Sequence, residues 1–231
     1  IEFIVLICVY KMMQVKTLRR IVFYVVTIVC NLFALYLSGS RTAWIPFVVT
    51  IPFMFLINKR FIYFTTSMAG IGGAGLLLLL EPKLMQRATI FQDFAKRSNI
   101  WETAIKGIQA HPLLGEGPLT YFHIYKQYHG HPTQHAHSIY LDPILSHGII
   151  GVILAGIYFA GNLKEVYLLL KRRIDLRLFS LISAFILTIL IHGILDYTVY
   201  WVQTGLLFLI VLSASSMYFH KEQPYDIQEE H

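Results

Sequence analysis

Histidine is the residue whose number and spacing stand out in the middle of the chain. Five histidines fall within fifteen residues: His123, His129, His131, His135 and His137. A neutral imidazole can act as a general base and accept a proton from a hydroxyl group, because histidine titrates near neutral pH. We expect this role at His137, with His135 as the second candidate, since an apolar segment begins directly after His137 at Ser138.

Two other interpretations of the histidine cluster remain open. The histidines could be polar loop residues without a chemical role. They could also bind zinc, which requires three or four ligands in tetrahedral geometry. The segment offers enough histidines, but it contains no cysteine and no HExxH pattern. We therefore expect no metal site.

Three arginines could bind an anion. Arg41 follows a short turn of glycine and serine that ends at Ser40, where N–H and O–H donors lie beside a fixed positive charge. Arg87 and Arg97 lie further along the chain, and a guanidinium group can grip a phosphate through two hydrogen bonds. The alternative for each arginine is an interfacial side chain that reaches toward lipid headgroups or solvent.

Four further ionisable residues lie in or at the ends of apolar segments: Asp142, His147, His192 and Asp196. Ionisable groups are costly in lipid, so they usually face the interior of a helix bundle. His192 and Asp196 are four residues apart and would share one face of a helix. The carboxylate could then orient the imidazole, or the two could form a purely structural hydrogen-bonded pair.

The elements that must position these residues are membrane helices. The chain is 56% hydrophobic and 14% charged, whereas soluble domains carry about a quarter charged residues. Apolar runs such as 21–37 are too long for an ordinary surface helix and lack the alternation of barrel strands. A helix needs about 20 mostly apolar residues to cross a bilayer. We predict an all-α, polytopic transmembrane helix bundle that forms a single membrane domain over residues 1–231.

The predicted spans follow from the apolar runs and the charged residues between them. The first is partial, because the chain starts with Ile1 inside an apolar run that ends at Lys11. We therefore expect the chain to be the C-terminal portion of a longer protein. The predicted boundaries are about 1–13, 21–38, 43–57, 61–80, 138–161, 178–195 and 200–219.

One long polar loop separates the predicted spans, over residues 81–137. Twelve basic residues lie in short segments on one side of the membrane, and such segments usually face the cytoplasm. The loop falls on the other side, so we predict that it is extracytoplasmic. The spacing of its apolar residues predicts an amphipathic helix that ends near 107–112 and lies on the membrane surface or over the bundle. Its predicted apolar face comprises Phe91, Phe94, Ser98, Trp101, Ile105 and Ile108.

Several short motifs follow one another in an order typical of one family. They are SR at 40–41, RSNIW at 97–101, HPLLGEGP at 111–118, HAHSIYL at 135–141 and GIIG at 148–151. Over roughly residues 35–200 the chain resembles the O-antigen ligase superfamily, which includes O-antigen ligases, O-antigen and capsule polymerases, and related oligosaccharyltransferases. One departure is Ser138, where the family often has asparagine.

The resemblance implies glycosyl transfer at the outer face of the bacterial cytoplasmic membrane. The donor would be a polyprenyl-diphosphate-linked glycan, and the acceptor a hydroxyl group of a glycan, lipid or wall polymer. Arg41 and one of Arg87 or Arg97 would hold the diphosphate, and His137 or His135 would be the base. We expect supporting roles for three residues: Ser40, His192 and Asp196. The resemblance implies no cofactor, and it does not separate ligases from polymerases or protein-glycosylating enzymes.

Other protein classes fit less well. A transporter or flippase of lipid-linked or other anionic substrates is the main alternative, although transporter sites usually lie near the bilayer midplane. A lipid-phosphate phosphatase would need histidine and aspartate where this chain has Phe47 and Ile51. Nucleic-acid binding is not expected, since the basic residues bracket apolar helices and contact membrane lipids instead of forming one stripe.

Overall fold

The computed structural model describes residues 1–81 and 87–219, without the side chains of residues 87–93 and 218–219. Over these residues the protein is all-helical, as predicted. The helices are α1 (Glu2–Met12), α2 (Leu18–Leu37), η1 (Thr42–Trp44), α3 (Ile45–Ile57), α4 (Phe61–Leu80), α5 (Arg87–Ala110), α6 (Thr120–Ile124), α7 (Asp142–Lys171), α8 (Leu176–His192), η3 (Thr198–Tyr200), α9 (Val202–Ser213) and α10 (Ser216–Phe219).

Three of these helices are long and apolar enough to cross a membrane. They are α2 and α4, each of 20 residues, and α7, of 30 residues. The helices α8 and α9 and the stretch 42–57 are apolar but shorter. The segment 200–219, predicted as one span, is divided into η3, α9 and α10, because turns interrupt the helix after residues 200 and 213.

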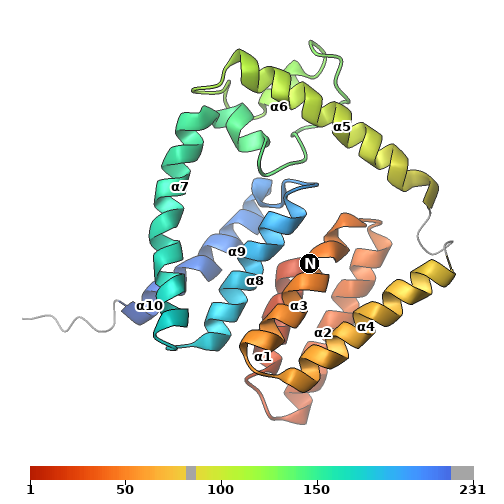
Figure 1. The fold of residues 1–231 in the computed structure, drawn as a ribbon, viewed down its shortest axis with the longest axis vertical. Helices are drawn as coiled ribbons and strands as arrows, with labels where there is room; N and C mark the ends of the chain where they lie inside the picture. The colour runs from red at the N-terminus through yellow and green to blue at the C-terminus, as the bar shows by residue number, and fades with distance from the viewer. Residues whose placement is uncertain (82–86, 220–231) are drawn as a thin grey trace, which may run out of the picture.

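The centre of the bundle is formed by α1, α3 and α8. The rings of Phe3 and Phe185 stack at 4.1 Å between α1 and α8, and Leu6 and Met54 are fully buried beside them. By contrast, α2 and α4 lie at the periphery (Figure 1), and the apolar residues of α4 are largely exposed. Exposed apolar surface of this extent is expected of helices that face lipid.

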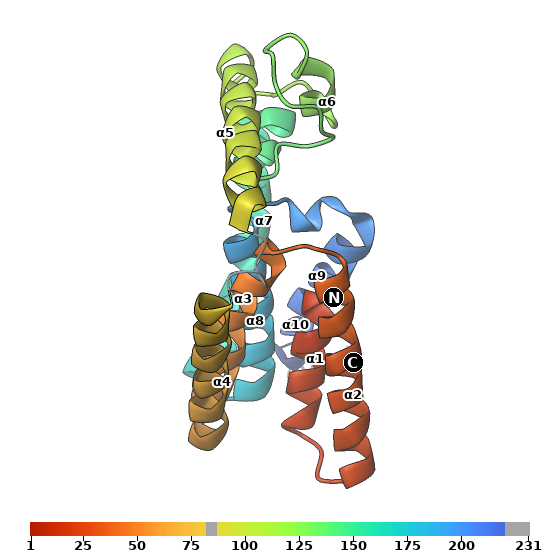
Figure 2. The ribbon, with the colours of Figure 1, turned by 90° about the vertical axis from the view of Figure 1, so that its right-hand side faces the viewer.

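The helices α5 and α6 form a separate layer beyond one end of the bundle (Figures 1 and 2). The buried face of α5 contains Ile100, Thr103 and Ala104, which pack near Tyr121 of α6 and Leu145 of α7. The helix α6 and the first turns of α7 pack against a stripe beside the predicted apolar face, and two members of that face, Phe94 and Ile105, are exposed in the structure. The amphipathic helix at the membrane surface stays a prediction.

A break inside α7 joins two of the sequence motifs. Gly148 has φ = 66°, which is outside the helical range and frees backbone groups on both sides of it. The N–H group of Ile149 donates to the carbonyl of Pro112 at 2.9 Å, and that of Gly117 donates to the carbonyl of Ser146 at 2.8 Å. A Cβ atom at Gly148 would collide with the backbone of Leu113. The HPLLGEGP and GIIG motifs are thus hydrogen-bonded to each other, and these bonds attach the layer of α5 and α6 to the bundle.

Candidate functional site

The centre of the candidate site is a hydrogen-bonded pair of His137 and Asp196. His137 lies in the loop between α6 and α7, and Asp196 lies between α8 and η3. The distance from His137 Nδ1 to Asp196 Oδ1 is 3.0 Å. The N–H group of Tyr197 also donates to Asp196 Oδ1, at 2.8 Å. Two segments that are 59 residues apart in sequence therefore meet at this pair.

The partners of His137 determine which ring nitrogen carries the proton. An ionised carboxylate can only accept, so Nδ1 donates its hydrogen to Asp196. The other nitrogen, Nε2, then has a free lone pair, and it lies 3.1 Å from the hydroxyl oxygen of Thr133. This is the tautomer that a general base requires, with a hydroxyl group already at the basic nitrogen.

Burial and nearby donors control the charge of Asp196. Burial by itself raises the pKa of this carboxyl group, but hydrogen bonds from His137 and from the Tyr197 N–H group outweigh it. Together with the charges of the two histidines, they lower the pKa of Asp196 to about 2. The group is therefore ionised at neutral pH and remains an acceptor for His137.

The turn that carries His137 is held by three other contacts. The backbone of His137 has φ = 46°, an uncommon conformation for a residue other than glycine. Asp142, which is 5% exposed, accepts a hydrogen bond of 2.6 Å from the N–H group of Ala136. The indole of Trp101 donates to the carbonyl of His137 at 3.4 Å, and the N–H group of Ile139 donates to Gly193 at 2.8 Å. Asp142 thus supports the turn instead of facing the base.

His135 packs beside His137 in a more enclosed position. Its ring centroid lies 4.3 Å from that of His137 and 4.9 Å from that of Tyr200. Its Nδ1 accepts a hydrogen bond of 3.2 Å from the His137 N–H group. Burial, followed by the charge of His137, lowers the pKa of His135 to about 4, so this imidazole is neutral at neutral pH. The geometry therefore favours His137 over His135 as the base.

The predicted arginines Arg41 and Arg97 line one cavity of about 220 Å³ with Asp196. Its complete lining is Gly39, Ser40, Arg41, Thr42, Phe94, Arg97, Leu195 and Asp196. Among the described residues, Nη1 of Arg97 is buried without a hydrogen-bond partner. An anion in the cavity would supply the missing acceptor. The side chain of Arg87, the third predicted arginine, lies outside the described residues.

The predicted pairing of His192 with the Asp196 side chain is replaced by other contacts. His192 Nδ1 lies 3.1 Å from Glu2 Oε2, and its Nε2 lies 3.2 Å from Thr42 Oγ1. The helix α8 ends at His192, so the four-residue spacing no longer places the two side chains on one helix face. The Asp196 carboxylate instead contacts His137.

Three residues of these contacts were not among the predicted site residues. Glu2 could have been found by the rule that pointed to His192, because it is an ionisable group beside an apolar run. Thr133 lies inside the histidine cluster, and Thr42 follows Arg41 directly. No sequence spacing connects Thr42 to His192, which is 150 residues away.

Three of these side chains lie close enough together to be candidate ligands of a metal ion. Atoms of His135, His137 and Asp196 lie within 4.8 Å of one another, as a metal site requires. However, both ring nitrogens of His137 already have partners, in Asp196 and Thr133. An ion bound here would have to replace at least one of these two hydrogen bonds.

Comparison with known proteins identifies the family. The family model of the O-antigen ligases matches residues 26–156, which is more than half of the chain. The match includes Arg41, Arg97, His135 and His137, whereas Asp196 and His192 lie beyond it. No curated protein and no solved structure matches significantly. The apolar helices and this match together make the chain a membrane protein of polysaccharide biosynthesis with a glycosyl-transfer or ligase function, and it belongs to the O-antigen ligase family.

Proposed function

We propose that this protein transfers a glycan from a polyprenyl diphosphate to an acceptor hydroxyl group. The observation that carries the proposal is the cavity lined by Arg41 and Arg97, because it reaches Asp196 and hence the His137 base. Two guanidinium groups suit a diphosphate, since each can form paired hydrogen bonds with phosphate oxygens. An anion site and a hydroxyl-activating base are then adjacent, as this reaction requires.

The proposed reaction is a single displacement. The acceptor oxygen attacks the anomeric carbon of the donor sugar, and the bond between that carbon and the diphosphate oxygen breaks. The bonding electrons leave with the diphosphate, whose developing charge Arg41 and Arg97 stabilise. His137 Nε2 takes the proton of the acceptor hydroxyl, and Asp196 stabilises the imidazolium that forms. Because the donor already carries a good leaving group, the proposed step uses neither a metal ion nor a nucleotide.

Thr133 indicates where the acceptor would bind. Its hydroxyl group lies 3.1 Å from His137 Nε2, which is hydrogen-bond distance for a hydroxyl that gives up its proton. We propose that the acceptor hydroxyl takes this place and displaces Thr133 from the basic nitrogen. The same contact keeps the imidazole in the required tautomer while the site is empty.

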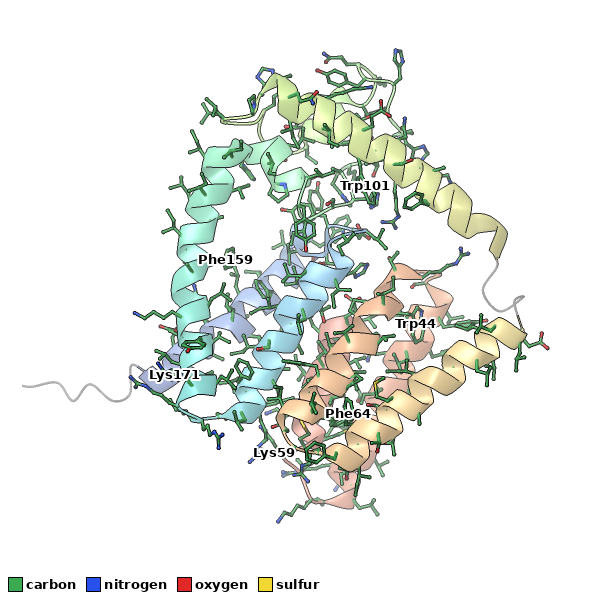
Figure 3. The ribbon with its side chains drawn as sticks, viewed as in Figure 1. Trp44, Lys59, Phe64, Trp101, Phe159 and Lys171 are labelled. Atoms are coloured by element: carbon green, nitrogen blue, oxygen red, sulfur yellow. The ribbon has the colours of Figure 1, made fainter. Side chains whose placement is uncertain are left out.

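The proposed location of the site is the extracytoplasmic side of the cytoplasmic membrane. Figure 3 shows Trp101 of α5 in the upper part of the view, and Lys59 and Lys171 in the lower part. The short loops near those two lysines hold several further basic residues. Because short basic loops usually face the cytoplasm, this separation supports an outward orientation of the site.

A reconstituted transfer assay tests the proposal. The purified protein in vesicles would receive a polyprenyl-diphosphate glycan and candidate acceptors of the lipid, glycan and wall-polymer classes. We expect release of polyprenyl diphosphate that depends on the acceptor and is lost in Arg41→Ala. The matched control is Arg172→Ala, which removes an exposed arginine at the other end of α7. Movement of the intact donor across the bilayer without release would contradict the proposal and indicate a transporter.

A further inference from the structure

A second histidine, His192, forms a buried set of contacts apart from the His137 base. It connects the first turn of α1, the end of α8 and the start of η1 through Glu2 and Thr42. The side chains of His192 and Glu2 are only 7% and 12% exposed. Because a carboxylate accepts, the His192 Nδ1–H group donates to Glu2, and in the neutral imidazole Nε2 accepts from the Thr42 hydroxyl.

Thr42 is the contact that reaches the anion cavity. It directly follows Arg41, and both residues line the cavity. The turn before them is held by local hydrogen bonds, from the Gly39 N–H group to the Tyr36 carbonyl at 3.2 Å and from the Ser40 N–H group to Ser38 Oγ at 3.3 Å. After Thr42 the chain enters the core, because Ala43 is 4% exposed. Thr42 thus joins the backbone of Arg41 to the His192 ring.

The backbone of His192 holds a second part of the lining of the same cavity. Its carbonyl accepts hydrogen bonds of 2.9 Å from the N–H groups of both Leu195 and Asp196. Leu195 and Asp196 line the cavity together with the arginine turn. His192 thus contacts one part of the lining through its ring and another through its carbonyl, and its ring is paired with the largely buried Glu2.

We propose that His192 is a positioning residue that holds Arg41 beside the Asp196–His137 pair, so that the cavity is preformed to bind the diphosphate of the donor. This inference rests on the proposed function for the identity of the ligand. His192 itself does not need to touch the donor. Its effect passes through Thr42 to Arg41, and through the backbone to Asp196.

The test uses steady-state kinetics of two changes at Thr42. Thr42→Val removes the hydroxyl with little change of shape, and Thr42→Ser keeps it. We expect Thr42→Val to raise the KM for the polyprenyl-diphosphate donor about tenfold with a small change in kcat, because the arginine contact is weakened before the chemical step. We expect Thr42→Ser to restore the donor KM. The control is Thr27→Val, whose hydroxyl donates to the Phe23 carbonyl within α2.

His192→Ala and Glu2→Gln extend the test to the other two members. We expect both to raise the donor KM in the same direction, and His192→Ala combined with Thr42→Val to cost no more than His192→Ala alone. A wild-type donor KM in folded Thr42→Val would overturn the inference. So would variants that lose only melting temperature, since a merely structural role would leave the KM of the folded fraction unchanged.

Direct binding of polyprenyl diphosphate separates this inference from the proposed function. If the wild-type protein binds polyprenyl diphosphate but never releases it from a glycan donor, the proposed function fails. The positioning role would still be supported if Thr42→Val weakened that binding. If wild-type transfer is normal and Thr42→Val binds and transfers as the wild type does, the positioning role alone fails.

Discussion

His137 and His192 have nearly the same partners but different surroundings. Each imidazole contacts a carboxylate through Nδ1, at 3.0 Å and 3.1 Å, and a threonine hydroxyl through Nε2, at 3.1 Å and 3.2 Å. The side chain of His137 is 28% exposed, and that of His192 is 7% exposed. A substrate hydroxyl could reach the basic nitrogen of the first histidine, whereas the second is enclosed by α1 and η1. Under the proposed roles, access to solvent is what separates the base from the positioning residue, because the local hydrogen bonding is shared.

The largest expected effect is the loss of the accessible histidine. We expect His137→Ala to lower kcat about a thousandfold, because general base catalysis contributes about 10²–10⁴-fold. Release of polyprenyl diphosphate at saturating donor and acceptor measures the change. His123→Ala removes an exposed histidine of α6 and serves as the control. Full transfer by folded His137→Ala would show that His137 is not the base.

Loss of one cavity arginine should have the next largest effect. We expect Arg97→Ala to lower kcat/KM about a hundredfold, because one donor to the developing diphosphate charge is missing. Arg97→Lys should recover only part of the loss, since an ammonium group lacks the paired geometry of guanidinium. Lys96→Ala, at the neighbouring exposed position, should be close to wild type. Wild-type activity of the Arg97→Lys variant would argue against a bidentate contact.

The carboxylate beside each histidine provides a third comparison. Asp196→Asn should lower kcat about tenfold to a hundredfold, because an amide can favour the wrong tautomer of His137. The pKa of Asp196 is about 2, so its ionisation should produce no acidic limb in the pH–rate profile of the wild type above about pH 4. Glu2→Gln should instead change the donor KM. If Asp196→Asn altered only the donor KM, the two carboxylates would have the same role.

The burial of His135 should make the folded protein less stable in acid. The pKa of His135 is about 4 when folded and 6.5 ordinarily, so the unfolded chain takes up the proton first as the pH falls. The free energy of unfolding should then decrease below about pH 6.5, and melting temperature should fall by a few degrees toward about pH 5. His135→Asn, whose oxygen can still accept from the His137 N–H group, should lose less. An identical pH dependence of the two proteins would contradict this cause.

The smallest expected effect is that of metal removal. Because both nitrogens of His137 already have partners, we expect dialysis against a chelator to leave the transfer rate unchanged. The measurement compares release of polyprenyl diphosphate before and after dialysis. Loss of activity that added zinc restores would identify His135, His137 and Asp196 as a metal site.

The sequence predicted the helical class and several individual elements, since long apolar runs leave few alternatives in a membrane. The predicted span 61–80 coincides with the helix α4. The sequence also pointed to Arg41, Arg97 and His137, because polar groups at the ends of apolar runs are unusual. The family resemblance implied that they act together, but their spacing alone could not show it, because their meeting depends on how α5 and the end of α8 pack.

The partner of His192 shows why the remainder of the site was missed. A spacing of four residues implies a shared face only while a helix continues, and α8 ends at His192, before Gly193. The glycine is a recognised signal for a helix end, so the break itself was predictable. The contacts with Glu2 and Thr42 were not, since they join segments that are 190 and 150 residues away in sequence.

The most direct test of the difference between the two histidines is a parallel kinetic measurement on His137→Ala and Thr42→Val. Both kcat and the KM for the polyprenyl-diphosphate donor would be determined at saturating acceptor. We predict that His137→Ala lowers kcat with little change in the donor KM, and that Thr42→Val raises the donor KM with little change in kcat. A change of the same parameter in both variants would contradict the assignment of His137 as the base and His192 as the positioning residue.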